Sequence, residues 1–254
     1  MQAVVYDNTF AGLLTAIFEV YEHKLANVNI MPANQRQDSL FNETFTVDTD
    51  DAKAARVLKG LKERLSADGF KAFCNTFLSE ETGMENKMLH YAQYAFSVAN
   101  ADKDYSHPAV LYIKNTAKKV HREKHRMEAF VRFQQTGDGL YYAIVDPDFN
   151  VLPLIERHFK KRYADQRWLI YDSRRKYGLY YNLDNTTIVT VDFNDAGGNT
   201  KDIATVLDDK EVLYQQLWQN YFASTNIKAR KNMKLHIRHM PKRYWKYLTE
   251  KQLM

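Results

Sequence analysis

Cysteine is nearly absent from the sequence, since Cys74 is the single one among 254 residues. One thiol excludes a disulfide within the chain, a cysteine-rich zinc module and an iron–sulfur cluster held by this chain alone. Long apolar runs are also missing, because none approaches the ~20 residues that a membrane-spanning helix needs. The first residues lack the basic segment and apolar block of a secretory signal. We therefore expect a cytoplasmic protein with no membrane partner.

Charge is divided unevenly along the chain. Residues 1–113 hold 10 Lys and Arg against 15 Asp and Glu, a net charge of −5, whereas residues 114–254 hold 26 against 16, a net charge of +10. The formal total is +5 and the isoelectric point is near 9.0, which favours anionic partners. The length and the hydrophobic content of 45% are sufficient for one large domain or two modest ones.

Hydrophobic periodicity predicts an α+β protein with a mostly helical N-terminal half. The expected elements there are a strand over 2–6, a helix over 10–21 capped by Thr9, a strand over 43–47, and helices over 52–65, 69–78 and 81–99. Residues 27–42 are polar and predict irregular structure. The small and charged residues of 99–108 predict a joint. We expect an acidic half over 1–106 and a basic α+β half over 107–254, as two domains or as one continuous domain.

The basic half is expected to contain an antiparallel sheet flanked by helices. A helix is predicted by apolar residues at spacings of three and four, namely Val110, Ile113, Ala117, Val120 and Met127. The further expected elements are a hairpin of strands 129–134 and 140–145, a helix over 153–163, and a meander of strands 167–171, 176–183 and 186–193. A capping box at Asp208 and Glu211 predicts a helix to Phe222, and Pro241 interrupts the helical pattern of the basic tail.

Four cations follow one another at i, i+4 spacing along the predicted basic helix. We call Lys114, Lys118, Arg122 and Arg126 the cation row. Each like-charged pair at this spacing costs an isolated helix roughly 0.2–0.5 kcal/mol, which Glu123 offsets only in part. Nucleic-acid phosphates are anions that such a row can contact. A solvated helix face explains the same pattern without a ligand.

Two later segments interleave cations with aromatic rings, one at a predicted hairpin tip and one in the basic tail. Their candidate nucleic-acid contacts are Arg174, Arg175, Tyr177, Tyr180, Lys242, Arg243 and Tyr244. This mixture is typical of sites for single-stranded nucleic acid. Core tyrosines of a sheet and lysines that cover apolar surface give the same pattern, and the tail also suits a partner protein.

An alternative catalytic set is formed by His121, Glu123, His125, Asp146 and Asp148. The two histidines have the i, i+4 spacing of the zinc motif H-E-x-x-H, but Arg122 stands where that motif has its catalytic glutamate. His121 and Glu123 also match half of a deaminase signature, which needs a later cysteine pair. The two aspartates suit general acid–base chemistry or Mg²⁺, and equally a strand-to-helix turn. We predict no metal and no resident cofactor.

Eight segments follow one another in a fixed order, namely residues 6–16, 121–127, 130–133, 150–154, 157–159, 168–172, 174–181 and 240–245. They resemble a bacterial family of DNA-metabolism proteins of unknown activity, with Asn8 where the family has glycine. The resemblance implies a partner, because family members are typically encoded beside a radical S-adenosylmethionine protein associated with DNA repair or modification. A similar domain is fused in some bacteria to a uracil-DNA-glycosylase-like domain. This chain lacks the three cysteines of a radical enzyme and the motifs of a glycosylase.

These observations lead to a hypothesis and two alternatives. The hypothesis is a nucleic-acid-binding accessory protein in DNA repair or modification, which presents DNA to a radical S-adenosylmethionine partner. The first alternative is an enzyme that acts on DNA or nucleotides through the catalytic set. The second is a protein–protein scaffold that does not contact DNA.

Overall fold

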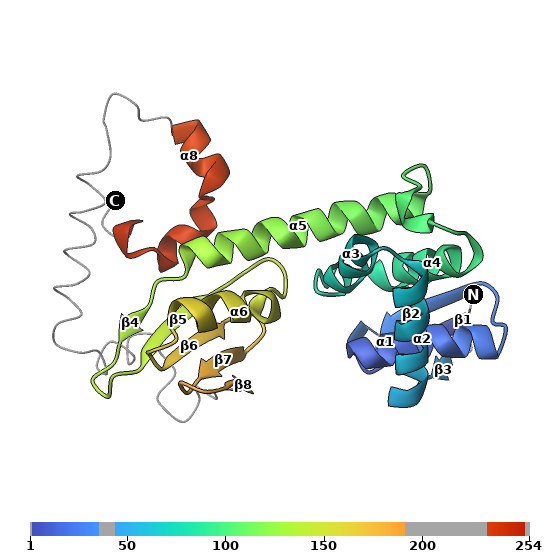
Figure 1. Cartoon of the computed structure of the whole chain (residues 1–254), viewed down its shortest axis with the longest axis horizontal. Coiled ribbons are helices and arrows are strands. Elements are labelled where there is room, and N and C mark those ends of the chain that lie inside the picture. The colour runs from blue at the N-terminus through green and yellow to red at the C-terminus, as the bar shows by residue number, and fades with distance from the viewer. Residues whose placement is uncertain (1, 36–43, 191–232, 252–254) are drawn as a thin grey trace. The chain divides into compact units, whose positions relative to one another are not determined.

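The computed structural model describes residues 2–35, 44–190 and 233–251 (Figure 1). The protein has the predicted α+β class. It has two compact units, Met1–His121 and Arg122–Met254, which we call the N-unit and the C-unit. Helix α5 (Pro108–Phe130) contributes residues to both units. The predicted division of the chain after residue 106 stays a prediction. In the described part of the chain, no helix combines the length and the apolar character needed to cross a bilayer.

A three-stranded parallel sheet opens the N-unit, with the strand order β2-β1-β3. Its members are β1 (Gln2–Tyr6), β2 (Val28–Pro32) and β3 (Thr44–Thr46). Helix α1 (Phe10–Glu22) connects β1 to β2. Val4 and Val5, whose side chains point to opposite faces of the central strand, are at most 4% exposed, as is usual for parallel sheets with both faces covered. The strands over 2–6 and 43–47 are thereby confirmed, whereas the prediction of irregular structure was wrong over Val28–Pro32.

Backbone groups at the outer edge of β2 form hydrogen bonds with a side chain that is distant in the sequence. The amide N–H of Ile30 donates to Asn86 Oδ1 at 2.9 Å, and Asn86 Nδ2 donates to the carbonyl of Ile30 at 3.3 Å. Buried backbone groups without partners cost free energy, so this amide supports a strand of polar sequence. Asn86 lies 56 residues from Ile30 along the chain. No local pattern therefore reveals the contact.

Three further helices complete the N-unit and confirm the predicted ones: α2 (Asp51–Arg64), α3 (Ala67–Phe77) and α4 (Met84–Ser97). Side chains cap the first turns of α1, α2 and α3, whereas Gly83 precedes α4 without a side-chain cap. Thr9 accepts from Gly12 N at the start of α1, as predicted, and Asp50 and Ser66 cap α2 and α3. Helices and sheet share one core, whose largest fully buried members include Leu13, Ile17, Leu61, Phe73, Met88 and Tyr91.

Glu85 of α4 is a buried acid in this core. Glu85 is 3% exposed, and the hydroxyl of Tyr6 donates a hydrogen bond to Oε1 of Glu85 at 3.3 Å. Among the described residues, no cation forms an ion pair with it. Burial raises the pKa of Glu85 because the charged form loses its hydration. The folded N-unit therefore holds this proton more tightly than the unfolded chain does.

We expect Glu85→Gln to stabilise the N-unit by about 1 kcal/mol at neutral pH. The amide keeps an acceptor for Tyr6 and removes the buried charge. Because the folded-state pKa is raised, wild-type stability falls as the pH rises above the ordinary glutamate range, and the variant lacks this loss. Urea unfolding followed by far-UV circular dichroism at about pH 5 and about pH 8 measures the difference. A variant that loses stability relative to wild type between these two conditions contradicts the assignment.

The C-unit contains a five-stranded sheet with the order β4-β5-β6-β7-β8. Its strands are β4 (Gln134–Gln135), β5 (Tyr141–Val145), β6 (Trp168–Asp172), β7 (Tyr177–Tyr181) and β8 (Thr186–Val189). The sheet is mostly antiparallel, and the predicted meander β6-β7-β8 is confirmed. β5 and β6 form one parallel pair, because helix α6 (Leu152–Arg162) carries the chain back between them.

The predicted strand over 129–134 is wrong for most of its length. Helix α5 continues to Phe130, and the N–H of Val131 still donates to the carbonyl of Met127 at 3.2 Å. Only Gln134–Gln135 pair as β4. The alternating apolar residues Ala129, Val131 and Phe133 resemble a strand, but they follow a helix that has already begun, and extending a helix is favourable.

Three short helical segments follow near the C-terminal end of the described chain, namely α8 (Met233–His239) and the 3-10 helices η6 (Lys242–Tyr247) and η7 (Thr249–Lys251). Pro241 stands between α8 and η6, so the predicted interruption is confirmed. Tyr244 and Leu248 are at most 2% exposed and anchor this segment. The predicted helix from Asp208 to Phe222 lies outside the described residues.

Candidate nucleic-acid interface

Helix α5 presents three cations of the cation row without ion-pair partners. Its predicted apolar face is confirmed, since Val110, Ile113 and Val120 are fully buried. Beside this face, Lys118 and Arg122 are exposed and Lys114 is half-buried. Within the described part of the chain, no carboxylate forms an ion pair with any of the three, and the ion pairs of α5 involve its other charged residues.

Both glutamates of α5 are turned away from solvent. Glu123 is 1% exposed. Glu128 is half-buried and accepts from Lys124 Nζ at 2.6 Å. The exposed polar residues of the helix therefore include no acid, and we call them the exposed stripe: Asn115, Lys118, Lys119, His121, Arg122 and His125. Lys119 pairs with Glu81 at 2.9 Å and stays 46% exposed.

Glu123 receives four donors, which explains the position of the fourth cation of the row. Arg126 Nη1 lies 3.3 Å and Arg243 Nη2 3.4 Å from the same oxygen, Oε2. The other oxygen accepts from the N–H of Asp148 at 2.9 Å and from the hydroxyl of Tyr244. Burial and the bond to Glu123 raise the pKa of Tyr244, so this phenol donates as the neutral form. Arg126 thus serves the fold of the C-unit, whatever else it contacts.

The predicted hairpin tip is the turn between β6 and β7, and its two arginines differ. Asp172, which is fully buried, accepts from the backbone N–H groups of Arg174 and Arg175 and from Arg175 Nη1 at 2.9 Å. Arg175 also donates to the carbonyls of Pro147 and Asp148. It therefore fastens the turn to the loop after β5. Arg174 is exposed and reaches the carbonyl of Asp148 at 3.4 Å.

The aromatic rings of the predicted interface lie mostly inside the C-unit. Tyr177 is half-buried and its hydroxyl donates to Asn150. Tyr180 is half-buried, and Tyr244 is 2% exposed. Nearby, Lys242 is exposed and its Nζ lies 6.0 Å from the centre of the Trp245 ring. These contacts are typical of packing within a fold.

Arg243 connects the C-terminal segment to two carboxylates. It pairs with Asp148 as well as with Glu123, and its side chain is 43% exposed. Lys246 pairs in turn with Asp146 at 3.3 Å. Asp146 and Asp148 directly follow β5, at the edge where the parallel strand β6 also ends in Asp172. The structure thus gathers acids and cations at one end of this strand pair.

The residues of the alternative catalytic set do not form one site in the structure. Glu123 and Asp148 are brought together. His121 and His125 belong to the exposed stripe, and the side chain of His125 is 81% exposed. Both oxygens of Glu123 already hold donors, which disfavours proton transfer through this group. Sequence patterns pointed to the acids but gave no sign that Asp172 organises the turn beside them, although aspartate is common at the start of a turn.

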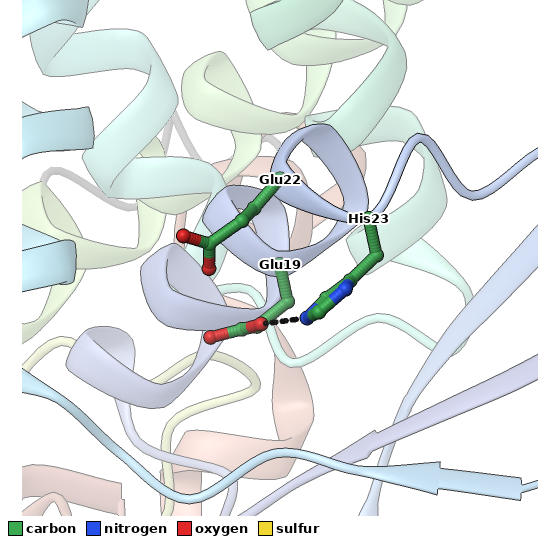
Figure 2. Close-up of side chains that lie close together, drawn as sticks. All are labelled: Glu19, Glu22 and His23. Atoms are coloured by element: carbon green, nitrogen blue, oxygen red, sulfur yellow. Dashed lines mark ion pairs between the residues drawn. The ribbon is translucent and has the colours of Figure 1, made fainter.

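One group of acids and histidine with the spacing of a metal site occurs in the described residues, and it lies in the N-unit. It consists of Glu19, Glu22 and His23 at the end of α1 (Figure 2). His23 Nε2 lies 3.0 Å from Glu19. Lys53 Nζ lies 2.6 Å from Glu19 and 2.9 Å from Glu22. Because this ammonium already bridges the two carboxylates, the group fits a salt-bridge cluster better than a cation site.

Comparison with known protein families assigns the chain to one of them. The sequence pattern of a domain of unknown function, DUF4130, matches residues 82–250. The match includes α4, α5 and all strands of the C-unit. No curated protein matches the chain. Because more than half of the 254 residues are matched, this protein belongs to the DUF4130 family of domains of unknown function.

Proposed function

We propose that this protein is a nucleic-acid-binding accessory protein in DNA repair or modification, which presents DNA to a radical S-adenosylmethionine partner. One observation carries the binding part of the proposal. Lys114, Lys118 and Arg122 lie on one helix without ion-pair partners in the described chain, while both glutamates of that helix are turned inward. The partner is supported by the resemblance of the ordered sequence segments to DNA-metabolism proteins.

The spacing of these cations suits a polyanion. Successive members of the cation row are four residues apart, so they rise by about 6 Å along the helix axis. A regular array of cations with no acid between them attracts regularly spaced phosphates and releases the counterions that those phosphates held. The affinity is then expected to fall steeply with salt. A single metabolite phosphate needs no such extended row.

The binding part of the proposal is tested with the purified protein and a fluorescently labelled DNA of about 20 base pairs, since one module covers at most a few turns. Fluorescence anisotropy is expected to show saturable binding at low salt that weakens as salt is added. Binding that is absent at low salt means that the positive half serves a protein or a small anion, and the proposal fails.

The partner is tested separately by co-purification with the radical S-adenosylmethionine protein. We expect a complex of the two proteins and DNA, with less partner recovered after nuclease treatment. Full recovery after nuclease favours the scaffold alternative, in which the basic surface meets an acidic protein. If the partner is not recovered with or without nuclease, the partner is removed from the proposal. DNA binding is then decided by the anisotropy titration alone.

A further inference from the structure

We infer that the nucleic acid bound by this protein is duplex DNA, held through its phosphates without base stacking. This inference rests on the proposed function and specifies its substrate. The sequence pattern of alternating cations and aromatic residues is typical of single-strand binding. The structure favours a different kind of site, because Lys118 and Arg122 are exposed, whereas no Phe, Tyr or Trp ring in the described part of the C-unit belongs to the exposed class.

The described Phe, Tyr and Trp rings of the C-unit are buried or half-buried. No Phe, Tyr or Trp in the described part of this unit belongs to the exposed class. The exposed Phe, Tyr or Trp side chains of the described chain are Tyr21 at 45% and Tyr105 at 58%, both in the N-unit, which also contains Lys114 and Lys118 but in which neither ring lies on α5. Single-strand binding proteins gain about 1–3 kcal/mol for each base stacked on an aromatic ring. Neither α5 nor the described part of the C-unit offers an exposed Phe, Tyr or Trp ring for that gain.

The rings nearest to cations already have partners. Trp245 has Lys242 Nζ at 6.0 Å and Lys251 Nζ at 5.2 Å from its ring centre, and His236 meets the ring at 64°. Arg243 lies 4.5 Å from the ring centre of Tyr244. A base that stacks on either ring has to displace these groups.

The cations themselves have the properties that a duplex requires. Lys114, Lys118 and Arg122 are carried by an uninterrupted helix of 23 residues, so their spacing is fixed. Phosphates of a duplex are also fixed, with one per ≈ 3.4 Å of axis on each strand. Neither the helix backbone nor the duplex then has to be ordered on binding, and only the cationic side chains lose freedom. A flexible single strand has to be ordered first, and stacking normally offsets that cost.

Counterion release determines the expected difference in affinity between duplex and single-stranded DNA. Each phosphate contact releases about 0.9 counterion from duplex DNA and about 0.7 from a single strand. For three contacts at about 70 mM salt, this difference alone favours the duplex by about fivefold. The protein should therefore bind a duplex more tightly than either of its strands, and intrinsic tryptophan emission should change little on addition of single-stranded DNA.

The experiment is a competition between a labelled duplex and its unlabelled separated strands, at matched length and with two unrelated sequences. We expect the duplex to be preferred by about fivefold for both sequences. Tighter binding of the single strand, accompanied by quenched tryptophan emission, overturns this inference and leaves the proposed function intact. Absence of binding to all DNA overturns both.

Discussion

Charge reversal of Lys114, Lys118 and Arg122 to glutamate is expected to raise the Kd for duplex DNA at least about 100-fold at about 0.1 M salt. Each lost phosphate contact forfeits the release of about one counterion, which is worth nearly a factor of ten at this salt. The three side chains have no ion pairs in the described chain, so their replacement should not disturb packing. Arg126 is left unchanged because it pairs with the buried Glu123.

A matched control separates local contact from net charge. Lys71, Lys87 and Lys103 are exposed lysines on α3, on α4 and in the short 3-10 helix Ala101–Lys103 of the N-unit. Their reversal to glutamate changes the total charge by the same amount. We expect this control to bind within about threefold of wild type, because these lysines lie on other elements than α5 and salt screens the interaction of exposed charges with a distant ligand. Equal losses in the two triple variants mean that net charge alone governs binding. Far-UV circular dichroism checks that both variants are folded.

Replacement of Glu123 by alanine is expected to destabilise the C-unit by about 3–5 kcal/mol. The carboxylate is 1% exposed and is the common acceptor for Arg126, Arg243, Tyr244 and the N–H of Asp148. Its removal leaves buried donors without an acceptor and two guanidinium groups facing each other. The C-terminal segment that carries Tyr244 should then lose its anchorage to α5.

Tryptophan emission is a selective readout for this variant. All three tryptophans, at positions 168, 218 and 245, belong to the residues of the C-unit. Urea unfolding followed by this emission therefore reports on the C-unit. Glu156→Ala on α6 is the control, since Glu156 is a half-buried acid with no ion pair in the described chain. We expect it to change stability by at most about 0.5 kcal/mol. A Glu123 variant as stable as this control contradicts the role assigned to the buried carboxylate.

The elements that the sequence predicted correctly have local signals. The cap of α1, the periodicity of α5 and the meander of the C-unit can all be recognised within short stretches of sequence. β2 was missed because its support comes from Asn86, far along the chain. The strand over 129–134 was wrong because alternation of apolar residues does not show where a preceding helix ends.

The same distinction applies to the candidate interface. The cation row followed from i, i+4 spacing, and the exposure of Lys118 and Arg122 agrees with it. The structural role of Arg126 could be predicted only in part. The sequence shows Glu123 at i−3 as a possible ion-pair partner, but it does not show that Glu123 is buried. That burial depends on Arg243 and Tyr244, 120 and 121 residues away. No periodicity links such positions, so the sequence alone did not separate cations that serve the fold from cations that face solvent.

The most direct test of the central claim is the salt dependence of duplex binding by wild type and by a variant with Lys114, Lys118 and Arg122 replaced by glutamine. This change removes the charge without adding repulsion. If the three side chains contact phosphates, the slope of log K against log salt should be shallower in the variant by about 2.7 units, or 0.9 for each contact. Equal slopes for the two proteins would show that the phosphates are neutralised elsewhere and that α5 is not the interface.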